Sequence, residues 1–159
     1  MPISVRRVVT GHDANGKAIV KIDEITKNWK QGRPGAWLTN VWATATSPAD
    51  NSSGADGGAA EVGTTMPEGS VFRIIDFQPG VQRRMHRTDS VDYLIVLDGE
   101  IDMQLDDGVE VHLKKGDVMV QRGTIHNWVN RGTQSCIVAV ILVHANSAVA
   151  GGKALPAEG

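Results

Sequence analysis

Four side chains in the second half of the chain have the types and spacing of a metal or acid–base site. His86 and Thr88 are two residues apart, so on a strand their side chains share one face. Asp92 follows on the next stretch of chain, and His126 comes from a separate segment. Two imidazoles and a carboxylate can bind Fe(II), Zn, Mn or Ni and leave coordination positions open for a substrate. One prediction is therefore a divalent metal held by His86, Asp92 and His126.

The same residues also fit a pocket that works without a metal. Thr88 is a poor ligand because its hydroxyl stays protonated at neutral pH. The Asp92 carboxylate is one methylene shorter than a glutamate, and this loss of reach exceeds the ~0.2 Å tolerance of coordination distances. His86 and His126 would then act as catalytic acid and base, or remain hydrogen-bonded interior groups.

Further residues are candidates for contacts with a substrate. Arg73 stands mid-strand in VFRIIDF, where a charged side chain needs a partner or a ligand unless it faces solvent. Inside a barrel its guanidinium would suit a carboxylate substrate and polarise a substrate oxygen as a catalytic group. Trp128 shares the parity of His126 and would form an apolar cavity wall. We expect Trp128, Gln121 and Thr88 to contact the substrate, although core packing for Trp128 and a strand end for Gln121 also fit.

Short strands closed by turn residues must position these side chains. From Ser70 onward, β-branched apolar runs end at turns that contain glycine, such as Asp98-Gly99 and Lys115-Gly116. Such strands at nearly regular spacing indicate an antiparallel sandwich or barrel, and no helical period longer than about two turns stands out. The sequence therefore predicts an all-β protein. The expected strands are residues 71–77, 92–97, 100–105, 109–113, 117–121, 125–129 and 135–143.

Less regular segments precede and follow these strands. Residues 6–10 and 18–22 are joined by HDANGK, whose Asn-Gly pair is a strong hairpin signal, and residues 37–46 predict another strand. The small, polar residues 47–65 predict a surface loop without chemistry of its own, although a lid over the cavity also fits. The Gly/Ala-rich tail predicts a frayed end or a short helix.

The order of residues from Gly80 onward resembles the first motif of the cupin superfamily, G-x5-H-x-H-x(3,4)-E-x6-G. Gly80 is followed after five residues by His86, and Thr88 stands at the second histidine position. Asp92 stands at the glutamate position, six residues ahead of Gly99. The resemblance therefore places metal-site residues of that family at His86 and Asp92, with one ligand replaced and one shortened.

The second cupin motif, G-x5-P-x-G-x2-H-x3-N, is similar to the segment that ends at Asn130. Gly123, His126 and Asn130 match it, Gln121 replaces the proline, and the spacing from the first glycine is one residue short. The resemblance implies a cupin double-stranded β-helix, or jelly-roll, barrel within one domain. Its parts would be an N-terminal β-hairpin extension and Gly/Ser-rich loop in residues 1–69, the barrel core in residues 70–145 and a tail in residues 146–159.

The resemblance also implies a function. Small single-barrel cupins with a thinned ligand set include enzymes that act on small organic acids or on aromatic or polyketide-like metabolites. We expect a lyase (a dehydratase or decarboxylase) or an isomerase in which His86 or His126 is the base. The alternatives are an Fe(II)-dependent dioxygenase and a cupin that binds a small molecule without turnover. Small cupins also commonly form homodimers.

Composition restricts the partners. The formal net charge is −2 and no long basic run occurs, so we expect neither a nucleic acid nor an anionic membrane as partner. The longest apolar run, residues 137–143, is far shorter than the ~20 residues of a membrane-spanning helix. The single cysteine, Cys136, and the absence of a signal-like N-terminal stretch predict a cytoplasmic protein. We expect a small-molecule substrate and no organic cofactor.

Overall fold

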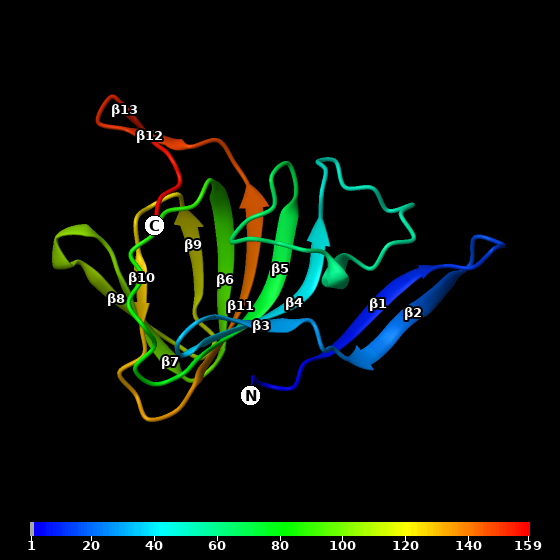
Figure 1. The fold of residues 1–159 in the computed structure, drawn as a ribbon, viewed down its shortest axis with the longest axis horizontal. Coiled ribbons are helices and arrows are strands. Elements are labelled where there is room, and N and C mark those ends of the chain that lie inside the picture. The colour runs from blue at the N-terminus through cyan, green and yellow to red at the C-terminus, as the bar shows by residue number, and fades with distance from the viewer. Residues whose placement is uncertain (1) are drawn as a thin grey trace.

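The chain is built almost entirely from antiparallel strands (Figure 1). The computed structural model describes residues 2–159. These residues contain two short 3-10 turns and no α-helix. Within them there is thus no helix long and apolar enough to cross a membrane. This confirms the all-β prediction. The strands are β1 (Arg6–His12), β2 (Ala18–Ile25), β3 (Trp29–Arg33), β4 (Ala36–Thr44), β5 (Ser70–Phe77), β6 (Ser90–Asp98), β7 (Glu100–Gln104), β8 (Glu110–Lys114), β9 (Val118–Arg122), β10 (Asn127–Val129), β11 (Cys136–His144), β12 (Ala148–Ala150) and β13 (Lys153–Leu155); the turns are η1 (Gly57–Ala59) and η2 (Asp106–Gly108).

Two sheets form the barrel. A six-stranded sheet has the order β3-β4-β5-β11-β6-β9, and a three-stranded sheet has the order β10-β7-β8. One cluster of buried side chains joins them, because Ile101, Met103 and Leu113 of the smaller sheet pack with Phe77 and Val138 of the larger. This arrangement confirms the predicted jelly-roll class.

Strand β11 explains the most apolar run of the sequence. It is the inner neighbour of both β5 and β6, so its backbone is paired on two sides. Val138 and Val140 point into the core between the sheets, whereas Ile137 and Ala139 pack on the opposite face with Ile74. A strand covered on both faces needs apolar residues at every position.

The strand register places three polar side chains on the inner face of the larger sheet. Arg73 lies opposite Val140, which also lies opposite Leu94. Asp92 lies two residues from Leu94 on β6 and opposite Gln121 on β9. Because alternate residues on a strand share a face, Arg73, Asp92 and Gln121 all point toward the interior of the barrel.

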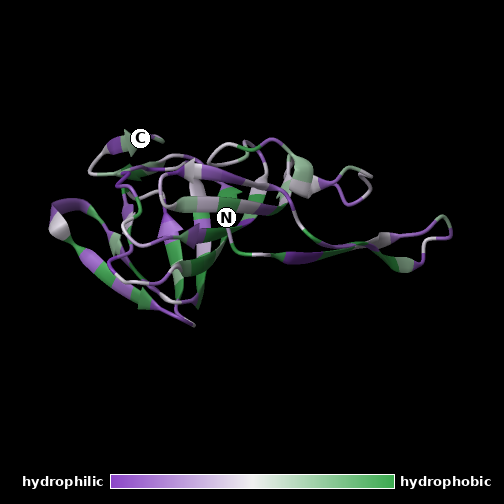
Figure 2. Ribbon diagram, turned by 60° about the horizontal axis from the view of Figure 1, so that its bottom comes forward, coloured by the Kyte–Doolittle hydropathy of each residue, from purple (hydrophilic) through white to green (hydrophobic). Residues whose placement is uncertain are grey.

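The N-terminal hairpin is present as predicted and projects from the barrel. Strands β1 and β2 pair antiparallel, and both views show them extending away from the other strands (Figures 1 and 2). Buried Arg7 anchors the hairpin, with salt bridges to Glu24 at 2.8 Å and to Asp56 at 2.5 Å and a hydrogen bond to the Val41 carbonyl. Through Asp56 the same side chain holds the loop that follows β4.

The loop at residues 47–65 does more than run over the surface. Val62 is buried in the core, and its carbonyl accepts a hydrogen bond from Lys30 Nζ at 2.9 Å. The neighbouring Gly63 carbonyl accepts a hydrogen bond from Arg73, and Gly63 and Thr64 line the central cavity. The expectation of a loop without a part in the site is therefore wrong for its last residues.

The tail and the segment before β4 also differ from expectation. Strands β12 and β13 pair across Gly151 and Gly152, both with positive φ, so the predicted frayed end or short helix is wrong. A two-residue Gly-Gly loop favours such a hairpin, whereas the small residues around it are typical of an irregular tail. Strand β3 was not expected because KNWKQGR is polar, as suits a mostly exposed edge strand.

Candidate active site

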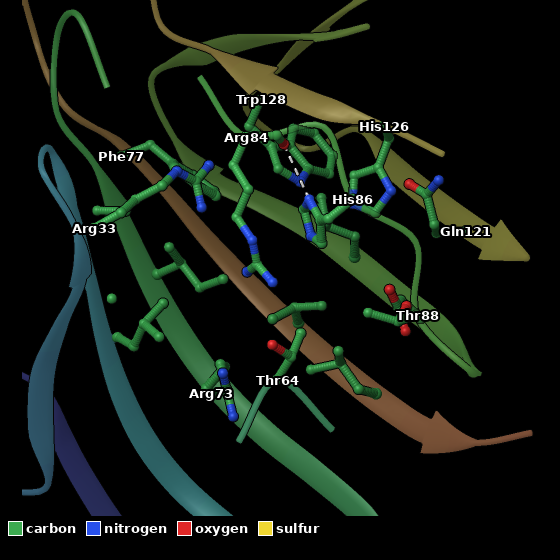
Figure 3. Close-up of a pocket in the computed structure, with 18 of the residues that line it drawn as sticks. Arg33, Thr64, Arg73, Phe77, Arg84, His86, Thr88, Gln121, His126 and Trp128 are labelled. Atoms are coloured by element: carbon green, nitrogen blue, oxygen red, sulfur yellow. Dashed lines mark hydrogen bonds between the residues drawn. The ribbon is translucent and has the colours of Figure 1, made fainter. Parts of the chain in front are cut away.

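A cavity of about 290 Å³ lies between the inner face of the larger sheet and β10 (Figure 3). Every residue singled out from the sequence as a site residue lines it. The polar and ionisable lining consists of Lys30, Arg33, Thr64, Arg73, Arg84, His86, Thr88, Asp92, Gln121 and His126. The apolar lining consists of Ala36, Leu38, Ile75, Phe77, Leu94, Trp128, Val140 and Leu142.

The two histidines form a direct pair. His86 and His126 lie opposite each other in an antiparallel β-bridge outside the named strands, with both backbone hydrogen bonds at 2.9 Å. Their ring centroids are 4.2 Å apart. The two motif segments, whose histidines are 40 residues apart in the sequence, thus meet in one two-residue contact.

Backbone carbonyls orient both rings. His86 Nδ1 lies 3.1 Å from the Arg84 carbonyl, and His126 Nδ1 lies 3.0 Å from the Thr124 carbonyl. A carbonyl only accepts, so in the neutral ring each Nδ1 carries the proton. Each Nε2 then holds a lone pair, and neither Nε2 has a hydrogen-bond partner among residues 2–159. The pair therefore presents two available bases to the cavity.

Burial keeps these imidazoles neutral. It lowers the pKa of His86 to about 4, with a further contribution from His126, and it also lowers the pKa of His126. Charged Arg33 and Arg84 act in the same direction on both rings. At neutral pH both rings can accept a proton but hold it only if a negative charge appears nearby.

Asp92 belongs to a second polar group. Its Oδ1 lies 2.5 Å from Ser90 Oγ, which also lies 2.9 Å from Thr88 Oγ1. Burial raises the pKa of Asp92 to about 6, while the Ser90 hydroxyl and the charge of Arg73 limit the rise. Asp92 makes no hydrogen bond to either histidine, and the two rings are oriented by the carbonyls of Arg84 and Thr124.

The remaining predicted residues complete the wall. Arg73 is buried rather than facing solvent, and its Nη2 donates to the Gly63 carbonyl at 2.9 Å. Trp128 stacks on Phe77 with ring centroids 5.9 Å apart and meets His126 edge-on at 5.8 Å. Gln121 is buried and donates from Nε2 to Thr124. Trp128 is thus both core and cavity wall.

These side chains do not assemble a three-ligand metal site. Among residues 2–159, no group of three or more His, Cys, Asp or Glu side chains is placed to hold a metal ion. His86 and His126 would supply two nitrogen ligands, whereas Asp92 is engaged with Ser90. The donor set expected from the sequence is therefore split between two places in the cavity.

Sequence reasoning missed several cavity residues. Lys30 and Arg33 come from β3, which was not predicted, and Thr64 comes from the loop expected to have no chemistry. Arg84 lines the cavity two residues before His86, and Ser90, two residues before Asp92, donates to that lining residue; each shares the parity of its neighbour. That parity was the one signal that could have identified them.

Comparison with protein families gives one match over the barrel. The family model of the cupin domain, Cupin_2, matches residues 73–143. This range contains every residue singled out from the sequence for the site.

Two fungal proteins are similar over most of the chain. Phomopsin biosynthesis cluster protein C′ of Diaporthe leptostromiformis is 43% identical over 134 residues, which cover 79% of this chain and 70% of that protein. Cupin-domain-containing oxidoreductase fogC of Aspergillus ruber is 34% identical over 156 residues, which cover 94% of this chain and 77% of that protein. Among solved structures, the cupin domain of Schizosaccharomyces pombe Cnp3 has a TM-score of 0.53 at 10% identity over 87% of each chain, a likeness of fold alone.

Proposed function

The chain belongs to the cupin-domain family, and on that premise we propose that it is a small-molecule enzyme of the acid–base class, a lyase or an isomerase. The observation that carries this proposal is the His86–His126 pair, with both Nδ1 atoms tied to carbonyls and both Nε2 atoms free. The substrate would be a small organic acid or an aromatic or polyketide-like metabolite. The two fungal relatives include a protein named for a biosynthesis cluster, which supports a metabolite of that kind.

The reaction would begin with removal of a proton from the carbon next to a substrate carbonyl. Nε2 of His86 or His126 takes the proton, and the C–H electron pair forms an enolate. The buried positive charge of Arg73 in the same cavity favours the negative enolate over the neutral substrate without contacting the reacting carbon. Because burial lowers the pKa of His86, this ring is unprotonated and able to accept a proton at neutral pH, and the enolate charge would stabilise the imidazolium that forms.

The second step distinguishes the reaction classes. In a dehydratase, the enolate electrons expel a hydroxyl from the next carbon, which leaves as water with the proton of the imidazolium. In an isomerase, the imidazolium returns the proton to a different carbon. In a decarboxylase, carbon dioxide would leave first, its C–C electron pair would form the enolate directly, and a water molecule would then protonate that enolate. None of these reactions needs an oxidant, and no step here passes through a metal.

Deuterium exchange tests the proposal without knowledge of the natural product. Small 3-hydroxy and 3-keto acids would be incubated with the protein in D₂O, and loss of the proton next to the carbonyl would be followed by NMR. We expect exchange with the wild type, and with His112→Ala, an exposed histidine on β8. His86→Ala and His126→Ala should lose it. Full exchange in both of these variants would show that the site assignment is wrong.

A second candidate function is an oxidation. It is favoured by the name of the Aspergillus ruber relative, a cupin-domain-containing oxidoreductase. The split between the histidine pair and Asp92 leaves two protein ligands for iron rather than three. Metal analysis of the purified protein together with oxygen uptake separates the two candidates. One equivalent of iron with substrate-dependent oxygen uptake would favour the dioxygenase.

We also infer that the chain forms a homodimer. A two-stranded hairpin is marginally stable alone, yet β1–β2 projects with Val8 and Val20 exposed, and Val118 and Val120 are exposed on β9. A two-fold exchange in which each hairpin packs on the β9 face of the other copy would cover both surfaces. Light scattering should give twice the chain mass for the wild type and for Val149→Lys, which changes a valine outside both surfaces. It should give the monomer mass for Val20→Lys, and a monomeric wild type would contradict the inference.

A further inference from the structure

The charges in the cavity are unbalanced, and Arg73 shows this most clearly. It is 3% exposed, donates one hydrogen bond to the Gly63 carbonyl, and has an Nε without any partner among residues 2–159. No carboxylate in that range lies within salt-bridge distance of it. A buried, unpaired guanidinium is unfavourable unless a ligand supplies the counter-charge.

Two more cations of the cavity lack an acidic partner. Lys30 Nζ donates to the Val62 carbonyl and Arg33 Nε to the Gln82 carbonyl, and Arg33 Nη2 is buried with no partner. Elsewhere in the chain the opposite pattern holds, since Arg6 and Arg131 are in salt bridges with aspartate or glutamate. The formal net charge of the chain is −2. The cavity is therefore locally cationic in an acidic protein.

Asp92 offsets only part of this positive charge, because it and Arg73 favour each other's charged form without forming a salt bridge. It is the one acidic side chain among the cavity-lining residues, and its closest contact is the Ser90 hydroxyl. It lies on β6, separated from Arg73 on β5 by strand β11. A second anion, supplied by a ligand, is needed to balance Lys30 and Arg73, which donate to the neighbouring carbonyls of Val62 and Gly63.

The other end of the cavity needs a hydrogen-bond donor. Gln121 is 3% exposed, its Nε2 is occupied by Thr124, and its Oε1 is buried without a partner among residues 2–159. Figure 3 shows Arg73 at one end of the cavity and Gln121, with the histidine pair, at the other. An unpaired amide oxygen calls for an N–H or O–H from a ligand.

Apolar side chains separate these two ends. Leu94, Val140 and Leu142 lie on the intervening strands, and Trp128 stacked on Phe77 forms an aromatic wall. Strands β5 and β9 are three strand spacings apart, on the order of 14 Å along the sheet, and the side chains reach inward from both. A molecule about as large as one substituted ring can span the remaining gap.

We infer that the cavity binds a hydroxylated carboxylic acid, with its carboxylate at Arg73, an apolar body against Phe77 and Trp128, and its hydroxyl at Gln121. The inference rests on the proposed function and names its substrate class. The hydroxyl end lies on the side of the histidine pair, where a leaving hydroxyl would need a proton.

Binding of simple probes tests the inference independently of turnover. Calorimetry at pH 7.5 would compare 3- and 4-hydroxybenzoate with benzoate and with the neutral hydroxybenzamides. We expect the hydroxybenzoates to bind most tightly. Arg73→Gln, which keeps a donor for Gly63, should weaken binding of the carboxylates by roughly tenfold or more and leave the amides unchanged. Arg122→Gln, an exposed arginine at the end of β9, is the control and should change neither.

Gln121→Met tests the other end. It should remove the preference for hydroxybenzoate over benzoate while benzoate itself still binds. Thermal unfolding of Arg73→Gln adds a readout that a purely structural role would not give. Because the variant removes an unpaired buried charge, its midpoint should equal or exceed that of the wild type.

Three results would overturn the inference: equal binding of carboxylate and amide, unchanged carboxylate binding in a folded Arg73→Gln, or no binding of any hydroxybenzoate. None of these depends on proton exchange. The proposed function would fail instead if the histidine variants kept full exchange while the probes bound as expected.

Discussion

Replacement of Asp92 by asparagine should change how stability depends on pH. The carboxyl is 5% exposed, and burial raises its pKa from 3.8 to about 6 in the folded protein. The facing groups are Ser90, which donates to it, and Arg73, which favours its charged form. The folded state therefore holds this proton more tightly than the unfolded state does.

The sign and size of the effect follow from proton linkage. Between pH 3.8 and about 6 the folded state binds more protons at Asp92, so this residue lowers the free energy of unfolding as the pH rises. At roughly 1.4 kcal/mol per pKa unit, the loss is about 3 kcal/mol and is complete above pH 6. His86 acts in the opposite direction, because its pKa falls from 6.5 in the unfolded state to about 4 in the folded state. As the pH rises from about 4 to 6.5, His86 therefore increases the free energy of unfolding by about 3 kcal/mol.

Asp92 thus opposes the contributions of His86 and of His126, whose pKa is also lowered, and Asp92→Asn uncovers the contributions of the two histidines. Urea unfolding at several values between pH 4 and pH 7.5 measures the free energy of unfolding of each protein. The wild-type value minus the Asp92→Asn value should fall by about 3 kcal/mol from pH 4 to pH 7. Asp107→Asn, at an exposed turn position, is the control and should leave the profile of the wild type unchanged. Parallel profiles for the wild type and Asp92→Asn would refute the raised pKa and the buried position of this carboxyl.

Further predictions concern the hairpin anchor Arg7, two glycines in turns and the lone cysteine. Arg7→Ala removes both salt bridges and the carbonyl contact of a buried guanidinium. It should lower the free energy of unfolding by about 2 kcal/mol and speed proteolysis of the loop around Asp56. An unchanged digestion pattern would contradict the anchoring role of Arg7. Gly99→Ala should be more destabilising than Gly108→Ala in denaturant titrations, because both glycines have positive φ but only at Gly99 would a Cβ lie 2.6 Å from a carbonyl oxygen. Equal losses would show that backbone strain alone matters. Cys136 is fully buried, and burial raises the pKa of its thiol to about 12. A thiol reagent should therefore label Cys136 only after the protein unfolds. Rapid labelling of the native protein would contradict the packing of β11.

The local pattern of the sequence was sufficient for most strands and for the candidate residues. The Asn15-Gly16 pair predicts the β1–β2 hairpin because a two-residue turn of this kind needs positive φ, which Gly16 adopts. The apolar run of β11 predicts a strand covered on both faces. The spacing of His86, Asp92 and His126 selects residues that all line one cavity. These are properties of neighbours along the chain, where turn chemistry and side-chain parity act.

The sequence could not predict which of these residues contact each other. His86 and His126 meet because two segments outside the strands form a β-bridge, whereas Asp92, on β6, is held by Ser90. A ligand set is a matter of distances between separate elements, and residue spacing does not contain them. The metal triad expected from the sequence stays a prediction, and in the structure its histidines form a pair while its carboxyl accepts from Ser90.

The charge balance of the cavity was likewise decided by the tertiary structure. Arg73 reads in the sequence as a cation that faces either solvent or a partner, and the register of β5 with β11 turns it inward. Lys30 and Arg33 join it because an exposed edge strand, polar in composition, closes one side of the cavity. The sequence by itself determined the strands and the chemical groups they carry. Tertiary structure decided which charges are buried, which have partners and what the pKa of each is, because burial and proximity between distant segments exist only in the folded chain.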